Sequence, residues 1–539
     1  MKHIEKIFNQ LTGCECKLQS SNNSDADLQF NGCFELARKA GVKPVEYATG
    51  LVDNLQKHGV NCQVSGNGFI NIYLSDRDVV TNYEATKTFV PFEYGKIMID
   101  FGGPNIAKGL HVGHLRSFVI GDVIQRMMSL AGYDTWSDIH LGDWGLPIGH
   151  VLSSIIRHGL EDHLDKLSLD DMNLLYPDSV ERCRNNPEEL EHVQDITRRL
   201  QAREEPYMTI WKKVRALSIQ AIKTVTGILN IEFDLWLGES DTQELLYGVR
   251  KTLMQNDLLV QSDGATIIEL EEGPPLIFEK ANGAILYGTT DLLTIFQREG
   301  VRTVYVTDNR QKAHFKQVFQ AAVKTSPYVL KQPIEEGKLQ HVGFGAVSGP
   351  DGKPLKTRDG NVPRLDTLLL EAMRKVEGVS QMEDARIIAM GCIRFADLAS
   401  PVTSGYRYDP DKMLSIHGRT GVYVQYAMVR ALAIASVFSK DGFFVEDDII
   451  ITNKEERALL IVLSKWQETM EKAVHTLEPS LIAGYAYDLA KAFNAFYGTS
   501  PINKASGDIM YSRYTILQGF IERMTQVLRV LGIGVPTRL

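Results

Sequence analysis

The fold is decided by residues 95–132, "GKIMIDFGGPNIAKGLHVGHLRSFVIGDVIQRMMSLAG". An apolar run of strand length comes first, and a loop with glycines and a proline follows it. Apolar residues then recur near helical spacing, at Leu115, Val119, Val123, Met127 and Leu130. Gly132 stands where a helix of this length would take its C-terminal cap. Strand, loop and helix in this order form half of a doubly wound unit.

Later segments repeat the same alternation. Strand-like runs occur in "DTWSDIHLGDWG", "TVYVTD" and "HVGFGAV", and helical stretches such as "QKAHFKQVFQAAVKT" separate them. Strands that alternate with helices of this length favour a parallel sheet with crossover helices. We therefore predict an α/β fold, a Rossmann-like doubly wound parallel sheet. Residues 151–230 are charged and helical in pattern and are interpreted as an insertion.

The two ends of the chain differ from this centre. Residues 1–88 mix helical periodicity with the short alternating run "GFINIYL", which predicts a small N-terminal α+β module. From about residue 380 long helical patterns such as "YVQYAMVRALAIASVFS" replace the strand signals, which predicts a C-terminal α-helical bundle. The predicted domains are 1–88, 89–379 and 380–539.

The composition limits the class of protein. The 539 residues are 44% hydrophobic and 23% charged, as in folded proteins, and the net charge of −9 disfavours indiscriminate nucleic-acid binding while leaving room for a local basic face. The first residues lack the apolar core of a secretory signal, and no segment is expected to approach the apolar length needed to span a membrane, so we predict a cytoplasmic protein. Six scattered cysteines without C-x-x-C spacing indicate reduced thiols and no zinc.

Two histidines lie at the predicted start of the helix. His111 and His114 follow the loop after the strand, where ligands bind in open parallel sheets and where free helix N–H groups attract phosphate. Both rings could donate to a phosphoryl group during reaction, and Lys108 could add a positive charge. Alone, the H-x-G-H pattern also fits packing or helix capping, and a two-histidine metal site is a third reading.

The pattern "HVGH" at 111–114 resembles the "HIGH" signature of class I aminoacyl-tRNA synthetases. More narrowly, the chain resembles the arginyl-tRNA synthetases. The similar segments are "PNIAKGLHVGHLRS", "HLGDWG", "YVTDNRQKAHFKQVF", "HVGFGAVSGPDGKPLKTRDG" and "YVQYAMVRA". These segments occur in the family's order, and the N-terminal module and the closing "VLRVLGIGVPTRL" are also similar to it, so the resemblance covers nearly the whole chain.

The resemblance implies a two-step ligation. The carboxylate of L-arginine attacks the α-phosphorus of ATP to give arginyl-adenylate and pyrophosphate, and the 2′-hydroxyl of the terminal adenosine of arginine tRNA then takes the arginyl group. It also implies that Mg²⁺ accompanies ATP and that activation requires bound tRNA. The implied catalytic residues are His111, His114 and Lys108. The implied ATP-binding residues are Gly113, His341, Gly343, Lys353, Lys356 and Arg358, the last three in a degenerate copy of the family's "KMSKS" loop.

The substrate side chain sets its own requirement. A guanidinium keeps its charge at physiological pH and is best held by carboxylates in bidentate contact. The resemblance assigns the arginine site to Asn105, Glu239, Tyr287, Asp291 and Gln311, with Asp291 as the main guanidinium ligand. Without the resemblance, each acidic residue would be interpreted as a solvated surface charge. Such a site would reject neutral citrulline, because a buried anion would be left unpaired.

Two positions depart from the family pattern. Gly103 stands where many relatives have a serine, and Pro147 where many have a glutamine. For tRNA contact the resemblance suggests Asn31, Phe69 and Asn71 in the N-terminal module and Tyr426 in the helical domain. Tyr423, Arg430 and Arg538 could also meet anticodon nucleotides, although aromatic residues at helical spacing more often belong to a core.

The expected partners are arginine tRNA, L-arginine and ATP, with no membrane contact, and the protein is expected to be a monomer. Three other readings stay open at this point. The first is another class I synthetase, which the arginine-site residues disfavour. The second is a tRNA-binding regulator that has lost catalysis, which the intact histidines, Lys108 and Asp291 disfavour. The third is a small-molecule nucleotidylyltransferase, which would not need the two flanking domains.

Overall fold

The computed structural model describes residues 2–20, 26–167, 169–281, 283–349, 351–353, 363–377, 382–439 and 448–539. The chain divides into two compact units, which are described separately. The first comprises Met1–Phe89, Phe438–Gln467 and Ala492–Phe520, and the second comprises Val90–Val437, Glu468–Lys491 and Ile521–Leu539.

The second unit is built on a parallel four-stranded sheet, which confirms the predicted fold class. Its strand order is β11-β10-β5-β6, formed by Leu339–Phe344, Arg302–Asp308, Lys96–Phe101 and Asp134–Asp138. In register, Tyr305 of β10 lies beside Asp100 of β5 and His341 of β11. The carboxyl ends of these strands therefore meet at one edge of the sheet, the edge at which open α/β folds bind ligands.

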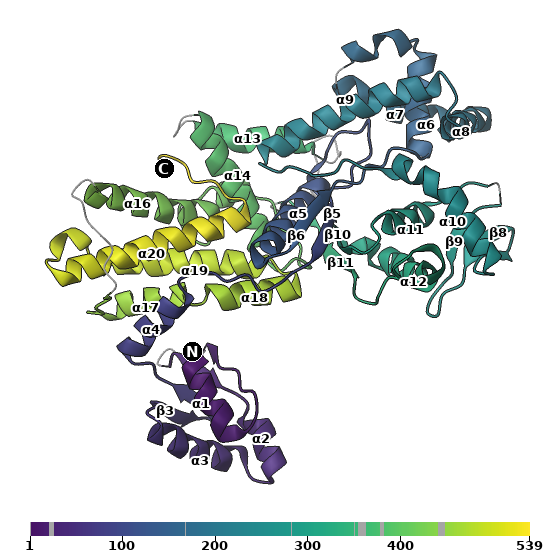
Figure 1. Ribbon diagram of the computed structural model, residues 1–539. Coiled ribbons are helices and arrows are strands. Elements are labelled where there is room, and N and C mark those ends of the chain that lie inside the picture. The colour runs from purple at the N-terminus through teal and green to yellow at the C-terminus, as the bar shows by residue number, and fades with distance from the viewer. Residues whose placement is uncertain are drawn as a thin grey trace. The chain divides into compact units, whose positions relative to one another are not determined.

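Helix α5, Val112–Ala131, connects β5 to β6 as the sequence predicts (Figure 1). It ends at Gly132, whose left-handed backbone and N–H bonds to the Met128 and Ser129 carbonyls form the expected cap. Two buried ion pairs tie α5 to α14, Met382–Leu398: Arg116 Nε lies 2.8 Å from Asp397 Oδ1, and Arg394 pairs with Asp122. The helix that carries the histidine pair is thus anchored along its length.

Around this sheet the second unit adds helices and a smaller sheet. The predicted insertion forms α6 to α9, Leu146–Arg157, Leu169–Arg184, Pro187–Gln201 and Tyr207–Ile228, with a 3-10 turn at Glu161–Lys166. Helices α10, α11 and α12 span Gln243–Gln255, Tyr287–Gln297 and Lys312–Val329. An antiparallel sheet that the sequence analysis did not predict is formed by β7, β8 and β9, Val260–Ser262, Ala265–Ile268 and Leu276–Glu279.

The last third of the chain is helical, as predicted. Its helices are α13 Leu365–Glu377, α14, α15 Pro410–Met413, α16 Gly421–Ser439, α17 Lys454–Leu463, α18 Trp466–Thr476, α19 Ser480–Thr499 and α20 Asp508–Leu531. Two short strands, β12 Val347–Ser348 and β13 Tyr406–Arg407, pair in parallel; β12 precedes α13, and β13 lies between α14 and α15. The stretch from 455 to 474 forms two helices, α17 and α18, although it has the pattern of one.

The membrane expectation needs a correction. Within the described residues, the window Gly421–Phe438 of α16 is long and apolar enough to cross a membrane by length and composition. Half of this window is buried inside the protein, and the core helix of a folded domain has the same composition. Among the described residues, the sequence therefore does contain one segment of membrane-spanning length and apolar composition.

The first unit contains the predicted α+β module. Its helices α1 to α4 span Lys2–Thr12, Cys33–Ala40, Pro44–Lys57 and Asp76–Thr86, and its strands β1 to β4 span Gln19–Ser20, Leu28–Phe30, Cys62–Ser65 and Phe69–Ile72. The strands pair antiparallel in the order β1-β2-β4-β3. Fully buried Phe8, Leu55, Ile70 and Ile72 form the centre of its core. In the same unit, Arg457 of α17 makes a bidentate contact with Asp27, at 2.7 and 2.8 Å.

Candidate functional site

The first half of the candidate site is the amino end of α5. His111 is the N-cap residue, and its Nδ1 accepts a hydrogen bond from the Gly113 backbone N–H at 3.0 Å. In return, the His111 backbone N–H donates to Nδ1 of His114 at 3.1 Å. The two histidines thus form a reciprocal capping box, and their ring centroids lie 4.0 Å apart. Gly113 is needed there, since a Cβ would lie 2.8 Å from His111 Nδ1.

This arrangement fixes the protonation of the pair. Burial lowers the pKa of His111, and burial together with the neighbouring His111 lowers the pKa of His114 to about 3. Both rings are therefore neutral at pH 7. Because Nδ1 of His111 accepts the Gly113 N–H, its ring proton sits on Nε2, which is left as a donor. Nδ1 of His114 lies 3.1 Å from the His111 backbone nitrogen and 3.3 Å from the His111 carbonyl oxygen. Capping and donation, which the sequence offered as alternatives, are compatible in one geometry.

The Lys108 side chain points towards the insertion and not towards the histidine pair. Its Nζ lies 3.6 Å from the centre of the Tyr176 ring, which belongs to helix α7 of the insertion. Burial lowers the pKa of the Lys108 ammonium. Among the contacts of the described residues, this cation–π contact is the one that places Lys108, and it joins the lysine to the insertion.

The predicted ATP residues fall into two groups. His341 and Gly343 lie on β11, where His341 Nε2 is 2.8 Å from Thr307 Oγ1 and its ring stacks on Phe315 at 4.9 Å. Burial lowers the pKa of His341 to about 4, so this ring is also neutral. Lys353 is at the edge of the described residues, and Lys356 and Arg358 lie outside them.

The second half of the site contains the predicted arginine residues. Asp291 and Tyr287 lie one turn apart on α11, and Tyr287 is 57% exposed. Asp291 Oδ2 lies 2.6 Å from Nε2 of His314, the third residue of α12, which the sequence analysis did not single out. Its place in "NRQKAHF", three residues after Gln311, was a signal that could have found it.

Glu239 is the buried acid of this half. It begins a 3-10 turn, Glu239–Thr242, and is only 9% exposed. Burial, followed by the negative charge of Asp143, raises the pKa of Glu239 to about 7. An apo site with this carboxyl is half protonated near neutral pH, and a guanidinium would favour the charged form.

A cavity of about 580 Å³ joins several of these residues. Glu239, Tyr287 and Pro147 line it, together with Gln194 and Arg198 of α8. Asp291 is not among its lining residues, although its charge acts on both Glu239 and Tyr287. The structure therefore brings Glu239 and Tyr287 to one cavity, with Asp291 close behind them.

The remaining arginine-site candidates lie at the edges. Asn105 pairs with Gly142 through a parallel bridge, which joins the loop after β5 to the "HLGDWG" segment. Gln311 is the last residue of the 3-10 turn Asn309–Gln311 and is exposed. Gly103 has φ of +53°, and no atom beyond a backbone oxygen of His140 lies within 4 Å of where its Cβ would be.

One group of acids and a histidine near the sheet edge has metal-ligand geometry. Asp100, Asp138 and His140 offer atoms within 4.8 Å of one another. The Arg298 guanidinium already lies there, with Nη2 donating to Asp100 Oδ2 at 2.8 Å and Asp138 Oδ2 at 2.6 Å. This arginine supplies the positive charge that a metal ion would bring.

The predicted tRNA contacts differ in accessibility. Asn31 is exposed and bonds to Gln19, and Phe69 packs edge-on against Phe34 at 5.1 Å. Asn71 is only 3% exposed, and its Oδ1 accepts a bond from Gln29 Nε2 at 2.9 Å. In the other unit Tyr426 is 47% exposed. Asn71 therefore acts within its sheet, while the other three side chains reach the surface.

Sequence comparisons agree with this geometry. The family model "tRNA synthetases class I (R), catalytic domain" matches residues 83–409, "DALR anticodon binding domain" matches 424–539, and "Arginyl tRNA synthetase N terminal domain" matches 1–74. The parallel sheet with its histidine-capped helix is thus the catalytic domain of a class I aminoacyl-tRNA synthetase. An arginine–tRNA ligase of Hyphomonas neptunium is 33% identical over 98% of this chain and 97% of its own. The chain belongs to the arginyl-tRNA synthetase family.

Solved structures share the fold over the full length. An arginyl-tRNA synthetase from Plasmodium falciparum matches 100% of this chain and 99% of its own, with a TM-score of 0.83 and 24% identity. One from Thermus thermophilus matches the same shares with a TM-score of 0.82 and 22% identity. The arrangement of strands and helices is therefore preserved at low sequence identity.

Proposed function

We propose that this chain ligates L-arginine to arginine tRNA. In the first step the arginine carboxylate attacks the α-phosphorus of ATP, so that arginyl-adenylate forms and pyrophosphate leaves. In the second step the 2′-hydroxyl of the terminal adenosine of the tRNA attacks the arginyl carbonyl, and AMP leaves. Family membership along the whole chain supports this reaction, because the models of a catalytic, an anticodon-binding and an N-terminal domain each match.

The observation that carries the proposal is the neutral histidine pair at the amino end of α5. The two rings stand at the positive end of the helix dipole, in the loop that follows β5 at the carboxyl edge of the sheet, and Nε2 of His111 is left as a donor. Charge that develops on the phosphoryl oxygens of ATP would be stabilised there without a covalent intermediate. Gly113, His341, Gly343 and the lysines of the 353–358 segment are the proposed ATP contacts, and Mg²⁺ would accompany the nucleotide as the counter-ion of its phosphates.

Arginine would be selected by charge and shape. The guanidinium would meet Asp291 and Glu239, with Tyr287, Asn105 and Gln311 around the rest of the substrate. Lysine carries the charge but cannot make the planar fork, and citrulline has the shape without the charge. Glu239 in the cavity and Asp291 behind it support this selection, because a neutral ligand would leave the charge of either carboxylate unbalanced.

The proposed setting is the cytoplasm, with no membrane contact, and the proposed state is a monomer. The proposed contacts with tRNA are Tyr426 and Arg538 of the helical domain and Asn31 and Phe69 of the N-terminal module. Phe69 is half-buried, and the other three are exposed. Single-stranded anticodon bases are commonly bound by stacking on such aromatic rings.

The test is arginine-dependent exchange of pyrophosphate into ATP, measured with and without arginine tRNA. Exchange with arginine but not with lysine or citrulline, and only when tRNA is present, is the expected result. No exchange under any condition, in protein that still binds tRNA, would exclude the enzyme and favour a regulatory relative. Exchange with another amino acid instead of arginine would mean that the enzyme activates a different substrate.

A further inference from the structure

The loop that carries Glu239 is held against the "HLGDWG" segment by backbone bonds. Leu141 N–H donates to the Leu237 carbonyl at 2.7 Å, and Glu239 N–H donates to the Leu141 carbonyl at 3.1 Å. Residues 235–242 are named here the Glu239 loop. These bonds attach the start of the loop to the "HLGDWG" segment. Side chains attach its outer turn, at Ser240 and Asp241.

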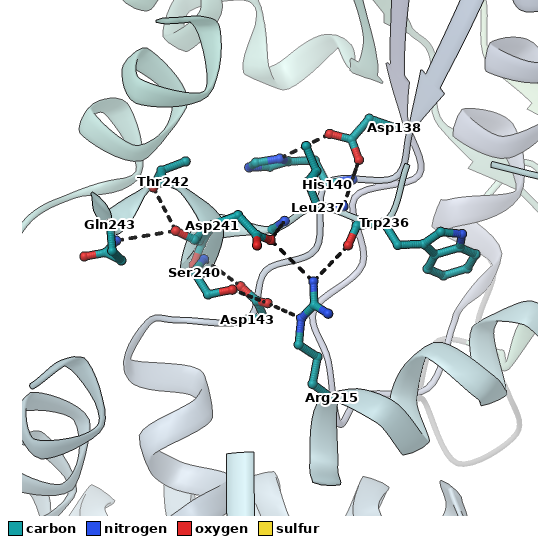
Figure 2. A network of polar contacts seen from close by, with 12 residues as sticks. Asp138, His140, Asp143, Arg215, Trp236, Leu237, Ser240, Asp241, Thr242 and Gln243 are labelled. Atoms are coloured by element: carbon teal, nitrogen blue, oxygen red, sulfur yellow. Dashed lines mark hydrogen bonds and ion pairs between the residues drawn. The ribbon is translucent and has the colours of Figure 1, made fainter. Parts of the chain in front are cut away.

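Asp143 holds that outer turn. Its carboxylate is fully buried and accepts from the Ser240 backbone N–H at 2.9 Å and from Ser240 Oγ at 2.8 Å (Figure 2). Gly238 packs directly on it, since a Cβ at that residue would lie 2.7 Å from Asp143 Oδ1. The Glu239 loop is therefore built around a buried negative charge.

Arg215 supplies the matching positive charge from helix α9 of the insertion. Its Nε donates to Asp143 Oδ2 at 2.8 Å, and its Nη2 donates to the Trp236 carbonyl at 2.8 Å and lies 3.4 Å from Asp241 Oδ2 (Figure 2). One turn earlier, Trp211 Nε1 donates to the Asp143 carbonyl at 2.7 Å. One guanidinium thus joins the insertion, the "HLGDWG" segment and the Glu239 loop.

We propose that Arg215 is a positioning residue for arginine recognition, which holds the Glu239 loop on Asp143 so that the Glu239 carboxyl stays at the substrate cavity. The inference rests on the proposed function, and it adds a residue that does not line the cavity. The planar fork suits this task, because one side chain binds a carboxylate and a carbonyl at fixed angles.

Electrostatics support the same role. Glu239 is faced by four groups: Asp143 and Asp291 favour its protonated form, His140 favours its charged form, and Tyr287 lies beside it. Arg215 offsets the charge of Asp143, the strongest of the acidic neighbours. Without Arg215, the full negative charge of Asp143 would act on Glu239 and favour its protonated form further. Protonated Glu239 pairs less well with a guanidinium than the carboxylate does.

The test compares Arg215→Met and Arg215→Lys with the wild-type enzyme, through equilibrium binding of arginine and the KM values for arginine and ATP. Arg215→Met is expected to raise the arginine KM by up to about 10²-fold, as for a displaced binding group, and to change the ATP KM little. Arg215→Lys is expected to restore part of the loss, since it returns the charge without the fork. Arg215→Met should also move the pH dependence of the arginine KM toward higher pH.

The matched control is Arg203→Met, which removes an exposed arginine whose Nη2 lies 3.5 Å from Glu244. It should leave all constants unchanged. If Arg215→Met does not fold, Ser240→Ala removes one bond to Asp143 and no charge, and a smaller rise in the arginine KM is expected. If Arg215→Met raised the KM values for arginine and ATP equally, or raised neither, the inference would be overturned. Arginine binding by the wild type would in that case still uphold the proposed function. Absence of arginine binding by the wild type would overturn both.

Discussion

The amino end of α5 and the Glu239 loop both hold polar groups at the edge of the sheet, but different kinds of contact fix them. At the helix, His111, Gly113 and His114 fix one another within four residues by backbone capping. At the loop, Asp143 is bonded to partners 72 and 97 residues away in the sequence. One is a local structure, and the other depends on the whole unit.

The difference extends to charge. The histidine pair is neutral at pH 7, so it needs no counter-ion and the loss of one ring leaves no buried charge. The loop is built around the buried carboxylate of Asp143, which pairs with Arg215, and breaking a buried ion pair is costly because one charge is left unpaired. The phosphate half should therefore tolerate change in its surroundings better than the arginine half does.

The largest effect is expected at the arginine half. Asp291→Asn removes the carboxylate proposed for the guanidinium but keeps an oxygen for His314. We expect kcat/KM for arginine to fall about 10³-fold, the upper part of the range for a truncated buried charge pair, with the ATP KM unchanged. Exchange kinetics at varied arginine would measure it. An unaltered arginine KM would remove Asp291 from the site.

The histidines are expected to act on turnover. His111→Ala should lower kcat for pyrophosphate exchange about 10²-fold, as loss of one donor to developing charge does, and lower stability by about 1 kcal/mol as loss of an N-cap. His111→Asn is the control, because asparagine caps helices well. If stability returns with asparagine while activity does not, donation and capping are separate; full activity in His111→Asn would mean that the ring only caps.

The pH dependence distinguishes the two halves without mutation. Glu239, with a pKa near 7, carries its proton at pH 6 and loses it at pH 8, and only the charged form pairs with a guanidinium. We expect the arginine KM to fall about tenfold from pH 6 to pH 8, because the charged fraction of Glu239 rises about tenfold between one pH unit below its pKa and one unit above it. Over the same range kcat should show no limb from His114, whose pKa of about 3 keeps it neutral.

Glu239→Gln gives the check on that assignment, since its arginine KM should be higher and independent of pH. Steady-state exchange in overlapping buffers at constant ionic strength would measure both profiles. A wild-type arginine KM that does not change with pH would show that Glu239 does not meet the substrate.

The same division explains what could be predicted from the sequence. The strand, loop and helix at 95–132, the parallel strands and the helical last third follow from periodicity, which is local. The position of the histidine pair at the start of the helix follows for the same reason, whereas its catalytic role was assigned through the resemblance. Glu239 and Asp291 were assigned only through the resemblance, since an isolated acid carries no sign of its burial.

The polar network around Asp143 could not be predicted from the sequence. Arg215 lies in a stretch that has the pattern of a solvated charged helix, and Asp143 is fully buried only because partners far away in sequence cover it. The sheet of β7 to β9 was missed because its strands have only three or four residues each, too few to establish an alternation. Asn71 fits the alternating run, yet it is buried by pairing with Gln29 on the neighbouring strand.

The smallest effect is expected at Gly103, which lies on the loop between β5 and α5. Its φ of +53° is a left-handed backbone, in which a side chain costs about 1–2 kcal/mol. Space is not the obstacle, because a Cβ would meet only the His140 carbonyl at 3.9 Å. Gly103→Ser should lower the midpoint of thermal unfolding by a few degrees and leave both KM values within about twofold. A marked fall in the arginine KM would instead show that the serine hydroxyl contacts substrate, and that the loop adopts another backbone when substrate is bound.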